Sequence, residues 1–249
     1  MDATQVSNRD VDYWREKFVN IPPNLDLPLD YVRPLSRSFS AARIDYLFDS
    51  ELTTALKRSA ATLKSSLVNV VLAGYFTLLH KLTSNQDIVV GLPIAGQAAL
   101  NHLDQAGHMV QLLPIRVELS PETPFGDLVL QVKRQILEAS DHPDFTYGKL
   151  IEGMIVDRDR VPLISSIFNI DQEMPALSFG DAVATVRSLP RSAENFELFV
   201  NIVPTKEGMV LETTYSTALF SEKTILAWLG GLKELLSAAS KDSSRKLAS

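Results

Sequence analysis

The four histidines are the first residues to weigh for proton transfer or metal binding. His102 and His142 each stand two residues before an aspartate, in His-Leu-Asp and His-Pro-Asp. Neither spacing places two ligands on one face of a helix, and no third ligand is evident, so we predict no metal site. His80 ends an apolar helical pattern, where a contact with a backbone carbonyl is expected. His108 follows Gly107 at the start of a predicted strand, where a solvent-facing position is expected.

Other signatures of catalysis are missing from the sequence. There is no Gly-x-Ser-x-Gly elbow for a serine nucleophile and no glycine-rich phosphate-binding loop. The chain has no cysteine, which excludes thiolate catalysis, disulfides and cysteine-containing zinc sites. Asp157-Arg158-Asp159-Arg160 could recruit phosphate, but its alternating charges favour a self-neutralising surface turn. The residues alone therefore offer no complete catalytic centre.

Composition limits the class of protein. Hydrophobic residues make up 45% and charged residues 22% of the chain, as in ordinary globular proteins. The net charge of -6 disfavours nucleic acid as a partner. The longest apolar stretch, 67–79, is interrupted by Asn69 and is shorter than the ~20 residues of a membrane-spanning helix. The N-terminus is polar and lacks a signal-peptide hydrophobic segment. We therefore expect a cytoplasmic protein without a membrane partner.

Hydrophobic periodicity predicts alternating strands and helices. A helix over 10–19 that presents Tyr13, Trp14 and Phe18 is expected to stop before a connector, 20–34, which contains four prolines. The predicted order after the connector is strand 40–48, helices 50–63 and 67–83, strand 88–94, loop 95–105, strand 109–119, helix 125–139, a short helix, strand 163–170, a hairpin of strands 196–204 and 209–217, and a last helix after Ser221.

Capping residues and apolar stripes define the predicted helices further. Asp49 or Ser50 is expected to cap the helix over 50–63, and Ser221 the last helix. Thr123 is expected to cap the helix that Pro124 opens. The residues expected to face inward are Phe125, Leu128, Val132, Ile136 and Leu137 in that helix, and Ile225, Trp228, Leu229, Leu232 and Leu236 in the last one.

These elements predict a mixed β-sheet covered by helices, an α/β (α+β) architecture. We divide the chain into three parts: a disordered start with a short helix and the proline-rich connector (1–36), a folded body (37–239) and a polar tail (240–249). A semi-rigid connector that precedes all the core elements suggests that a folded unit once stood upstream.

Several phrases of the sequence occur together in a recognisable order. Asp157–Asn169 is similar to an "RDxSRxPL" phrase that runs on to "FN", and Phe196–Phe220 is similar to an "FDL" strand with a "Y-x-T-x-L-F" ending. By these phrases the chain resembles the condensation domains of nonribosomal peptide synthetases. The other matching phrases are Tyr13-Trp14, Leu27-Pro28-Leu29-Asp30 with Arg33-Pro34, Gln86–Gly96 and Gly107–Arg116.

The resemblance implies a fold and a reaction. Condensation domains pair two chloramphenicol-acetyltransferase-like lobes and join a donor acyl or peptidyl thioester to the amine of an acceptor aminoacyl thioester, each held on the phosphopantetheine arm of a carrier protein. The chain resembles the C-terminal half and lacks the family's HHxxxDG signature, whose second histidine would handle the proton of the acceptor amine. The expected partners are the missing N-terminal lobe and the two carrier proteins. No cofactor is expected to bind the chain directly.

The resemblance also selects the residues expected near the substrate tunnel. No catalytic residue is expected in this chain, and the tunnel residues should orient substrate. Gln97 stands where the family commonly has arginine, so it would hold an aspartate of the other lobe more weakly. The predicted tunnel residues are Gln97, His108, Gln111, Ser165 and Asn169.

Two other functions remain open at this point. The chain could be a carrier-protein or partner docking module without catalysis, or a complete small acyltransferase with His108 as its base. An isolated lobe should expose the apolar surface that its partner covers, more than the few hundred Å² typical of a monomer. We therefore expect self-association through that surface.

Overall fold

The structure is a computed structural model. It describes residues 8–95, 110–143, 146–152, 160–171, 178–179, 182–183 and 188–247.

A six-stranded mixed sheet forms the centre of the described chain, as predicted, and its strand order is β1-β8-β7-β4-β2-β3. Strand β4 runs parallel to both of its neighbours, whereas all other pairs are antiparallel. A separate two-stranded sheet is formed by β5 and β6. The strands are β1 (Ala41–Asp49), β2 (Asp87–Ala95), β3 (Val110–Glu118), β4 (Ser166–Ile170), β5 (Ser178–Phe179), β6 (Ala182–Val183), β7 (Leu198–Thr205) and β8 (Gly208–Ser216).

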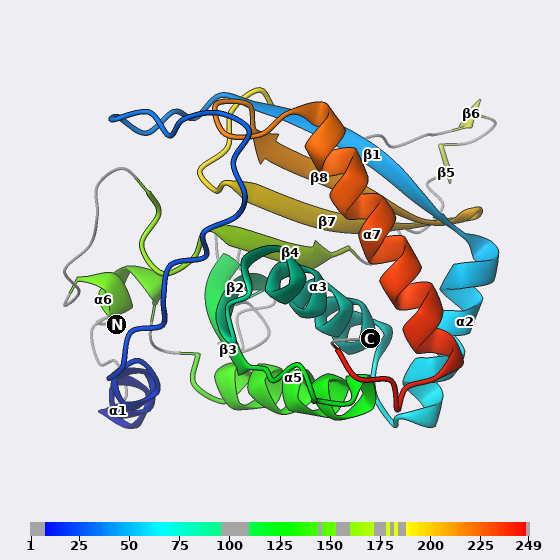
Figure 1. The fold of residues 1–249 in the computed structure, drawn as a ribbon, viewed down its shortest axis with the longest axis horizontal. Coiled ribbons are helices and arrows are strands. Elements are labelled where there is room, and N and C mark those ends of the chain that lie inside the picture. The colour runs from blue at the N-terminus through cyan, green and yellow to red at the C-terminus, as the bar shows by residue number, and fades with distance from the viewer. Residues whose placement is uncertain are drawn as a thin grey trace.

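Four long helices pack on one side of the sheet (Figure 1). Three of them begin at residues whose side chains accept a backbone N–H: Asp49, Ser66 and Ser221 are the N-caps of α2, α3 and α7. This type of capping satisfies helix N–H groups that would otherwise lack partners. The helices are α1 (Asn8–Lys17), α2 (Ser50–Thr62), α3 (Leu67–Thr83), α5 (Phe125–Ser140), α6 (Tyr147–Ile151) and α7 (Glu222–Lys241).

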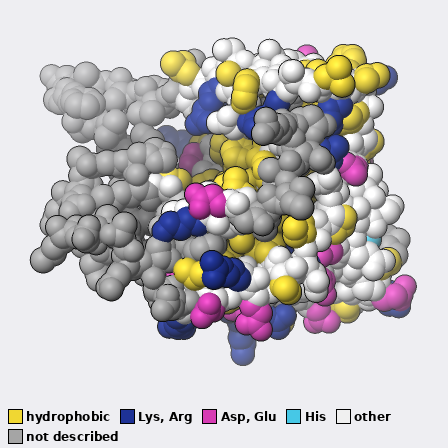
Figure 2. All heavy atoms as spheres, turned by 90° about the vertical axis from the view of Figure 1, so that its left-hand side faces the viewer, with side chains coloured by type: hydrophobic (Ala, Val, Ile, Leu, Met, Phe, Trp, Pro, Cys, Tyr) yellow, Lys and Arg dark blue, Asp and Glu magenta, His cyan; other side chains and the backbone are white. Residues whose placement is uncertain are grey.

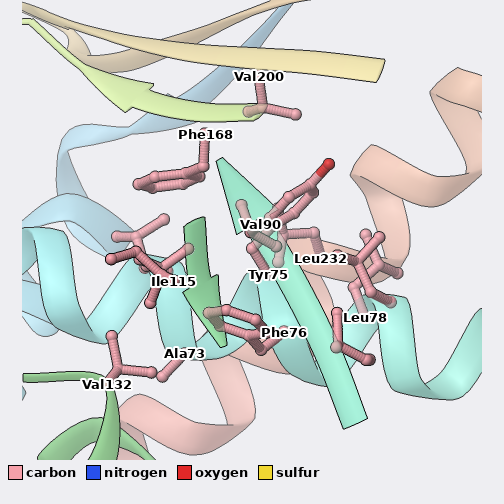
Figure 3. Packing of buried hydrophobic residues seen from close by; sticks show 14 of the residues in the cluster. Ala73, Tyr75, Phe76, Leu78, Val90, Ile115, Val132, Phe168, Val200 and Leu232 are labelled. Atoms are coloured by element: carbon pink, nitrogen blue, oxygen red, sulfur yellow. The ribbon is translucent and has the colours of Figure 1, made fainter. Parts of the chain in front are cut away.

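The core lies between α3 and the sheet (Figure 3). Helix α3 is apolar almost all round, and its residues from Asn69 to His80 are buried. Tyr75 of α3 packs on Phe168 of β4, with ring centroids 5.7 Å apart. The Tyr75 hydroxyl forms a 2.5 Å hydrogen bond with Ser166 Oγ. That bond removes the cost of burying two unpaired hydroxyl groups and ties α3 to the middle of the sheet.

The N-terminal helix α1 lies against the β3 edge of the sheet. Arg116 of β3 makes a two-pronged ion pair with Asp87, at 2.7 and 2.9 Å. The same guanidinium donates to the backbone oxygens of Lys17 (2.6 Å) and Asn20 (2.9 Å) at the end of α1. On the other side of α1, Trp14 Nε1 donates to the His142 carbonyl at 3.1 Å. The second half of the helix is therefore anchored both to β3 and to the segment after α5.

Some sequence predictions need correction. Thr123 does not cap α5, because its Oγ1 accepts from Ser120 N, and the N-cap Pro124 makes no side-chain capping bond. Leu137 is 57% exposed, because it lies off the buried stripe of α5 that includes Leu128 and Val132. His80 does contact a carbonyl, as predicted, through Nδ1 at 2.7 Å from Asn85 O.

The strand predicted over 163–170 begins only at Ser166, because Leu163 has a φ of 63° and forms a turn. Residues 1–7 of the predicted disordered start lie outside the described residues, and so do residues 96–105 of the predicted loop. In the predicted polar tail, Leu247 is only 3% exposed and packs in the core.

Two glycines give a matched test of the packing between α3 and α7. A Cβ atom at Gly74 would lie 2.4 Å from Leu236 Cδ2, whereas at Gly231 it would meet nothing within 4 Å. We expect Gly231→Ala to stabilise the fold by about 0.5–1 kcal/mol through helix propensity. Gly74→Ala should destabilise it by about 1 kcal/mol, because overpacking exceeds the same gain. Urea unfolding of both variants measures the difference. Equal shifts would show that α3 and α7 do not approach closely at Gly74.

Candidate functional site

One face of the sheet is turned away from α2, α3, α5 and α7, and we call it the open face. The alternation along β7 shows the two sides: Leu198, Val200 and Ile202 are buried in the core, whereas Phe199 and Asn201 are only partly buried. The strand pairing puts neighbours of Asn201 on the same side, because cross-strand partners in a sheet share a face. The open face therefore carries Asn169 of β4, Asn201 of β7 and Glu212 of β8.

Four strands contribute to a continuous row of polar side chains on the open face. Asn169 of β4 lies opposite Asn201 of β7, and Asn169 Nδ2 donates to Asn201 Oδ1 at 2.8 Å. Asp171 accepts from both amides, from Asn169 at 3.0 Å and from Asn201 at 2.9 Å. We call this set, with the three residues of the next paragraph, the polar row.

The polar row continues to the β1 edge of the sheet. Asn201 pairs with Glu212 of β8, and Glu212 pairs with Asp45 of β1. Two carboxylates directly opposite each other repel, and Arg43 lies between them, 2.8 Å from Asp45 Oδ1 and 3.5 Å from Glu212 Oε1. Arg43 is 10% exposed and Glu212 13% exposed, so this ion pair is shielded more than a surface pair.

A second polar cluster surrounds the side chain of Glu197, which is 7% exposed. Arg33 Nη1 lies 2.7 Å from Glu197 Oε1, whereas Glu197 Oε2 has no hydrogen-bond partner among the described residues. Arg37 and Arg160 line the same cavity, whose volume is about 20 Å³. A cavity of that size holds one water molecule and is too small for a substrate. We therefore interpret the cluster as a structural ion pair.

The predicted surface turn around Asp157–Arg160 is described only from Arg160 onward. Arg160 Nη1 contacts Asp26 Oδ1 of the connector at 2.7 Å. Just after it, Ile164 N donates to Pro162 O at 2.6 Å, which closes a three-residue turn around Leu163. A leucine at a φ of 63° is strained. This turn leads directly into β4 and sets where Ser165 and Asn169 lie.

The structure places the predicted tunnel residues in different surroundings. Gln97 and His108 lie outside the described residues. Ser165 is buried just before β4, and its carbonyl accepts from Glu197 N at 2.9 Å. Asn169 belongs to the polar row. Gln111 lies on the same side of β3 as Leu113 and Ile115, which pack in the core, so it points to the side opposite Asn169. Its Oε1 is buried without a partner among the described residues.

Asn201, Glu212 and Arg43 were not predicted as site residues. A signal for two of them was present in the sequence. The predicted turn Thr205–Gly208 fixes the hairpin register and so places Asn201 opposite Glu212. An amide paired with a carboxylate in the middle of a hairpin indicates a face that is not packed under helices.

The described residues contain no group of three or more His, Asp or Glu side chains that could hold a metal ion. In the same part of the chain, no single helix is both long and apolar enough to cross a membrane; α2 and α3 pass that test only as a pair, bent by 104°.

The connector is fastened to the start of α7 by Asp30. Its Oδ2 accepts from Ser221 N at 2.7 Å and its Oδ1 from Thr224 Oγ1 at 2.8 Å. These bonds, the Ser221 N–H first among them, hold the pKa of Asp30 below its ordinary value. A carboxylate also suits the positive N-terminal end of a helix. The connector is thus held in a fixed position at the start of α7.

Comparison with known proteins places this geometry in a family. The family model described as "Condensation domain" matches residues 2–249. The chain belongs to the condensation-domain family of nonribosomal peptide synthetases. It is 31% identical to surfactin synthase subunit 2 of Bacillus subtilis (strain 168) over 96% of this chain, and 33% identical to surfactin synthase subunit 1 over 99%. The chain spans only 7% of the length of each of these two relatives.

Solved structures show the same fold. The four-domain nonribosomal peptide synthetase AB3403 matches 98% of this chain with a TM-score of 0.88 at 19% identity, over 20% of its own length. The condensation domain of the monacolin K polyketide synthase MokA matches 97% of the chain with a TM-score of 0.85 at 22% identity. The match covers 59% of the MokA chain, little more than half of its length.

The Asp30 tether predicts a pH-dependent contribution to stability. Because the pKa of Asp30 is lowered in the fold from an ordinary 3.8, its contribution is present above that pH and is lost as pH falls through the lower folded-state pKa. Asp30→Asn should therefore lower the urea midpoint more at about pH 7 than at about pH 2. The exposed Asp12→Asn is the control. An equal loss at both pH values would contradict the tether.

Proposed function

We propose that this chain acts as the C-terminal lobe of a condensation domain and requires an N-terminal lobe for amide bond formation. One observation carries the proposal: the chain matches 54–59% of several condensation-domain and related chains and contains no HHxxxDG sequence. The histidine of that signature would act as the proton-handling group in the resembled reaction. The cytoplasmic location expected from the sequence stays a prediction.

Residues 31–39, at the end of the connector and just after it, expose several apolar side chains, and we call them the connector surface. This surface supports the proposal that a second lobe binds here. Val32 is 95% exposed and Leu35 is fully exposed, and Tyr31 and Phe39 are about half exposed. Figure 2 shows hydrophobic side chains along the top of this side of the molecule and in its central hollow. Exposed apolar residues that cluster in one segment indicate an interaction surface, whereas single ones are ordinary. We assign this surface to contact with the N-terminal lobe.

In this proposal the open face forms one wall of the reaction chamber. Its polar row offers fixed hydrogen-bonding groups but no histidine among its members, so it would orient substrate and leave proton transfer to the other lobe. Orienting the substrates alone can raise the reaction rate strongly, because holding two reactants together makes a bimolecular step effectively unimolecular. The donor and acceptor groups would arrive on phosphopantetheine arms of carrier proteins, which are the proposed partners.

A second candidate function is a docking module without catalysis. One observation favours it. The X-domain from teicoplanin biosynthesis, solved in complex with OxyB, matches 97% of this chain with a TM-score of 0.85 at 21% identity. A protein of this fold therefore binds another protein in that assembly. Here the connector or the open face would bind a carrier or tailoring partner, and no amide would form.

Reconstitution from two halves tests the proposed function. The chain is mixed with donor- and acceptor-loaded carrier proteins, with and without a separately expressed N-terminal condensation lobe, and amide product is measured by mass spectrometry. We expect product only when both halves are present. Binding of carriers without product in either mixture favours the docking module. Product from this chain alone would show a complete acyltransferase and overturn the proposal.

The connector surface gives a separate prediction about lobe binding. Leu35→Asp should weaken the affinity of the chain for the N-terminal lobe by at least about tenfold, because burying a leucine contributes about 1.5–3 kcal/mol. Leu137→Asp on α5 is the matched control, since Leu137 is exposed but lies on the helical side. Titration calorimetry compares the two. Equal weakening by both variants would rule out the connector as the specific contact.

A further inference from the structure

Two carboxylates of the polar row, Asp171 and Glu212, determine which way the asparagine amides point. A carboxylate only accepts hydrogen bonds. Asp171 therefore requires the NH₂ groups of Asn169 and Asn201 on its side, and both lie there, at 3.0 and 2.9 Å. Glu212 Oε2 accepts from the same Asn201 NH₂ at 3.4 Å. The reverse orientation of either amide would set a carbonyl oxygen against Asp171.

This orientation leaves one group of the row available. Both hydrogen bonds of the Asn169 side chain use its NH₂ group, one to Asp171 and one to Asn201 Oδ1. No described residue donates to Asn169 Oδ1. Asn169 is partly exposed on the open face, so its carbonyl oxygen can receive a hydrogen bond from a group other than the described residues.

We infer that Asp171 and Asn201 are positioning residues that fix the Asn169 side chain so that its Oδ1 accepts an N–H group of the substrate. The inference rests on the proposed function, because it assumes that the open face lines the reaction chamber. It narrows the ligand group at this point to a hydrogen-bond donor, which is the amine or amide N–H in the proposed reaction, and excludes a carbonyl or carboxylate. Without the row, the asparagine amide could rotate and present NH₂ instead.

The hydrogen-bond lengths show which member of the row orients the amides most strongly. The bonds of Asp171 to the two amides are about half an ångström shorter than the 3.4 Å contact of Glu212 with Asn201. Hydrogen bonds to a charged group are the stronger kind, so Asp171 is the main positioning residue. Arg43 acts at the far end, where it neutralises Glu212 and Asp45.

The orientation itself is measured on the isolated chain. The side-chain NH₂ signals of Asn169 and Asn201 are assigned by ¹⁵N NMR, and their hydrogen exchange is followed. We expect slow exchange at both, and faster exchange at Asn169 in Asp171→Leu and in Asn201→Leu. The NH₂ of Asn85, which donates to Asn24 O far from the row, is the internal control. Unchanged exchange at Asn169 in both variants would overturn the positioning role.

A double-mutant cycle tests the substrate contact in the reconstituted two-lobe protein. Asn201→Leu and Asp171→Leu should each reduce kcat/KM for the acceptor amine about tenfold, the loss of one fixed hydrogen bond. In an Asn169→Ala background, Asn201→Leu should cause no further loss, because it acts only through Asn169. Asp127→Leu, an exposed acidic residue of α5, is the matched control and should keep full activity.

The outcomes separate the inference from the proposed function. Additive losses, or full activity of Asn169→Ala, would overturn the role of Asn169 while leaving the two-lobe proposal intact. No product from the unaltered halves would overturn the proposed function and with it the substrate contact. The NMR exchange result then still decides whether Asp171 and Asn201 orient Asn169.

Discussion

The sheet has two faces, and the long helices described here cover one of them. Leu198, Val200 and Ile202 pack beneath the helices, while Phe199 and Asn201, which alternate with them, lie on the other side. That division follows from the two-residue period of a strand and holds for each strand of the sheet. A face with partly exposed phenylalanine and a shielded ion network is suited to contact with another structural unit.

Hydrogen bonding on the open face complements the packing beneath it. On the core side, the hydroxyl groups of Tyr75 and Ser166 form a hydrogen bond. This bond anchors β4 in the middle of the sheet. On the open side, the same strand presents Asn169 to its partners on β7. Rigid placement of β4 therefore supports both the core and the polar row. The strained turn at Leu163 sets the start of that strand, and strain of this kind persists only where surrounding packing holds it.

Much of the fold could be predicted from local patterns. The turn Thr205–Gly208 correctly defined the hairpin, and every residue predicted on the stripe of α7 is buried, although the prediction left out Ala239. Local rules failed where a neighbouring polar group competed: Thr123 bonds to Ser120 and leaves α5 without a side-chain cap. The pairing of Asn169 with Asn201 could not be predicted, because the two residues are 32 positions apart and their parallel register is set by tertiary packing. The phrase that contains Asn169 points to that residue but not to the residues that hydrogen-bond its side chain.

The central claim is that this chain is one half of a two-lobe condensation domain, with its partner on the open face and connector. Hydrogen–deuterium exchange of the chain with and without a purified N-terminal condensation lobe tests it most directly. The account predicts that the added lobe slows exchange in the connector and in peptides containing the edge strand β1, and leaves α5 and α7 unchanged. Protection confined to the helical side, or none at all, would contradict it.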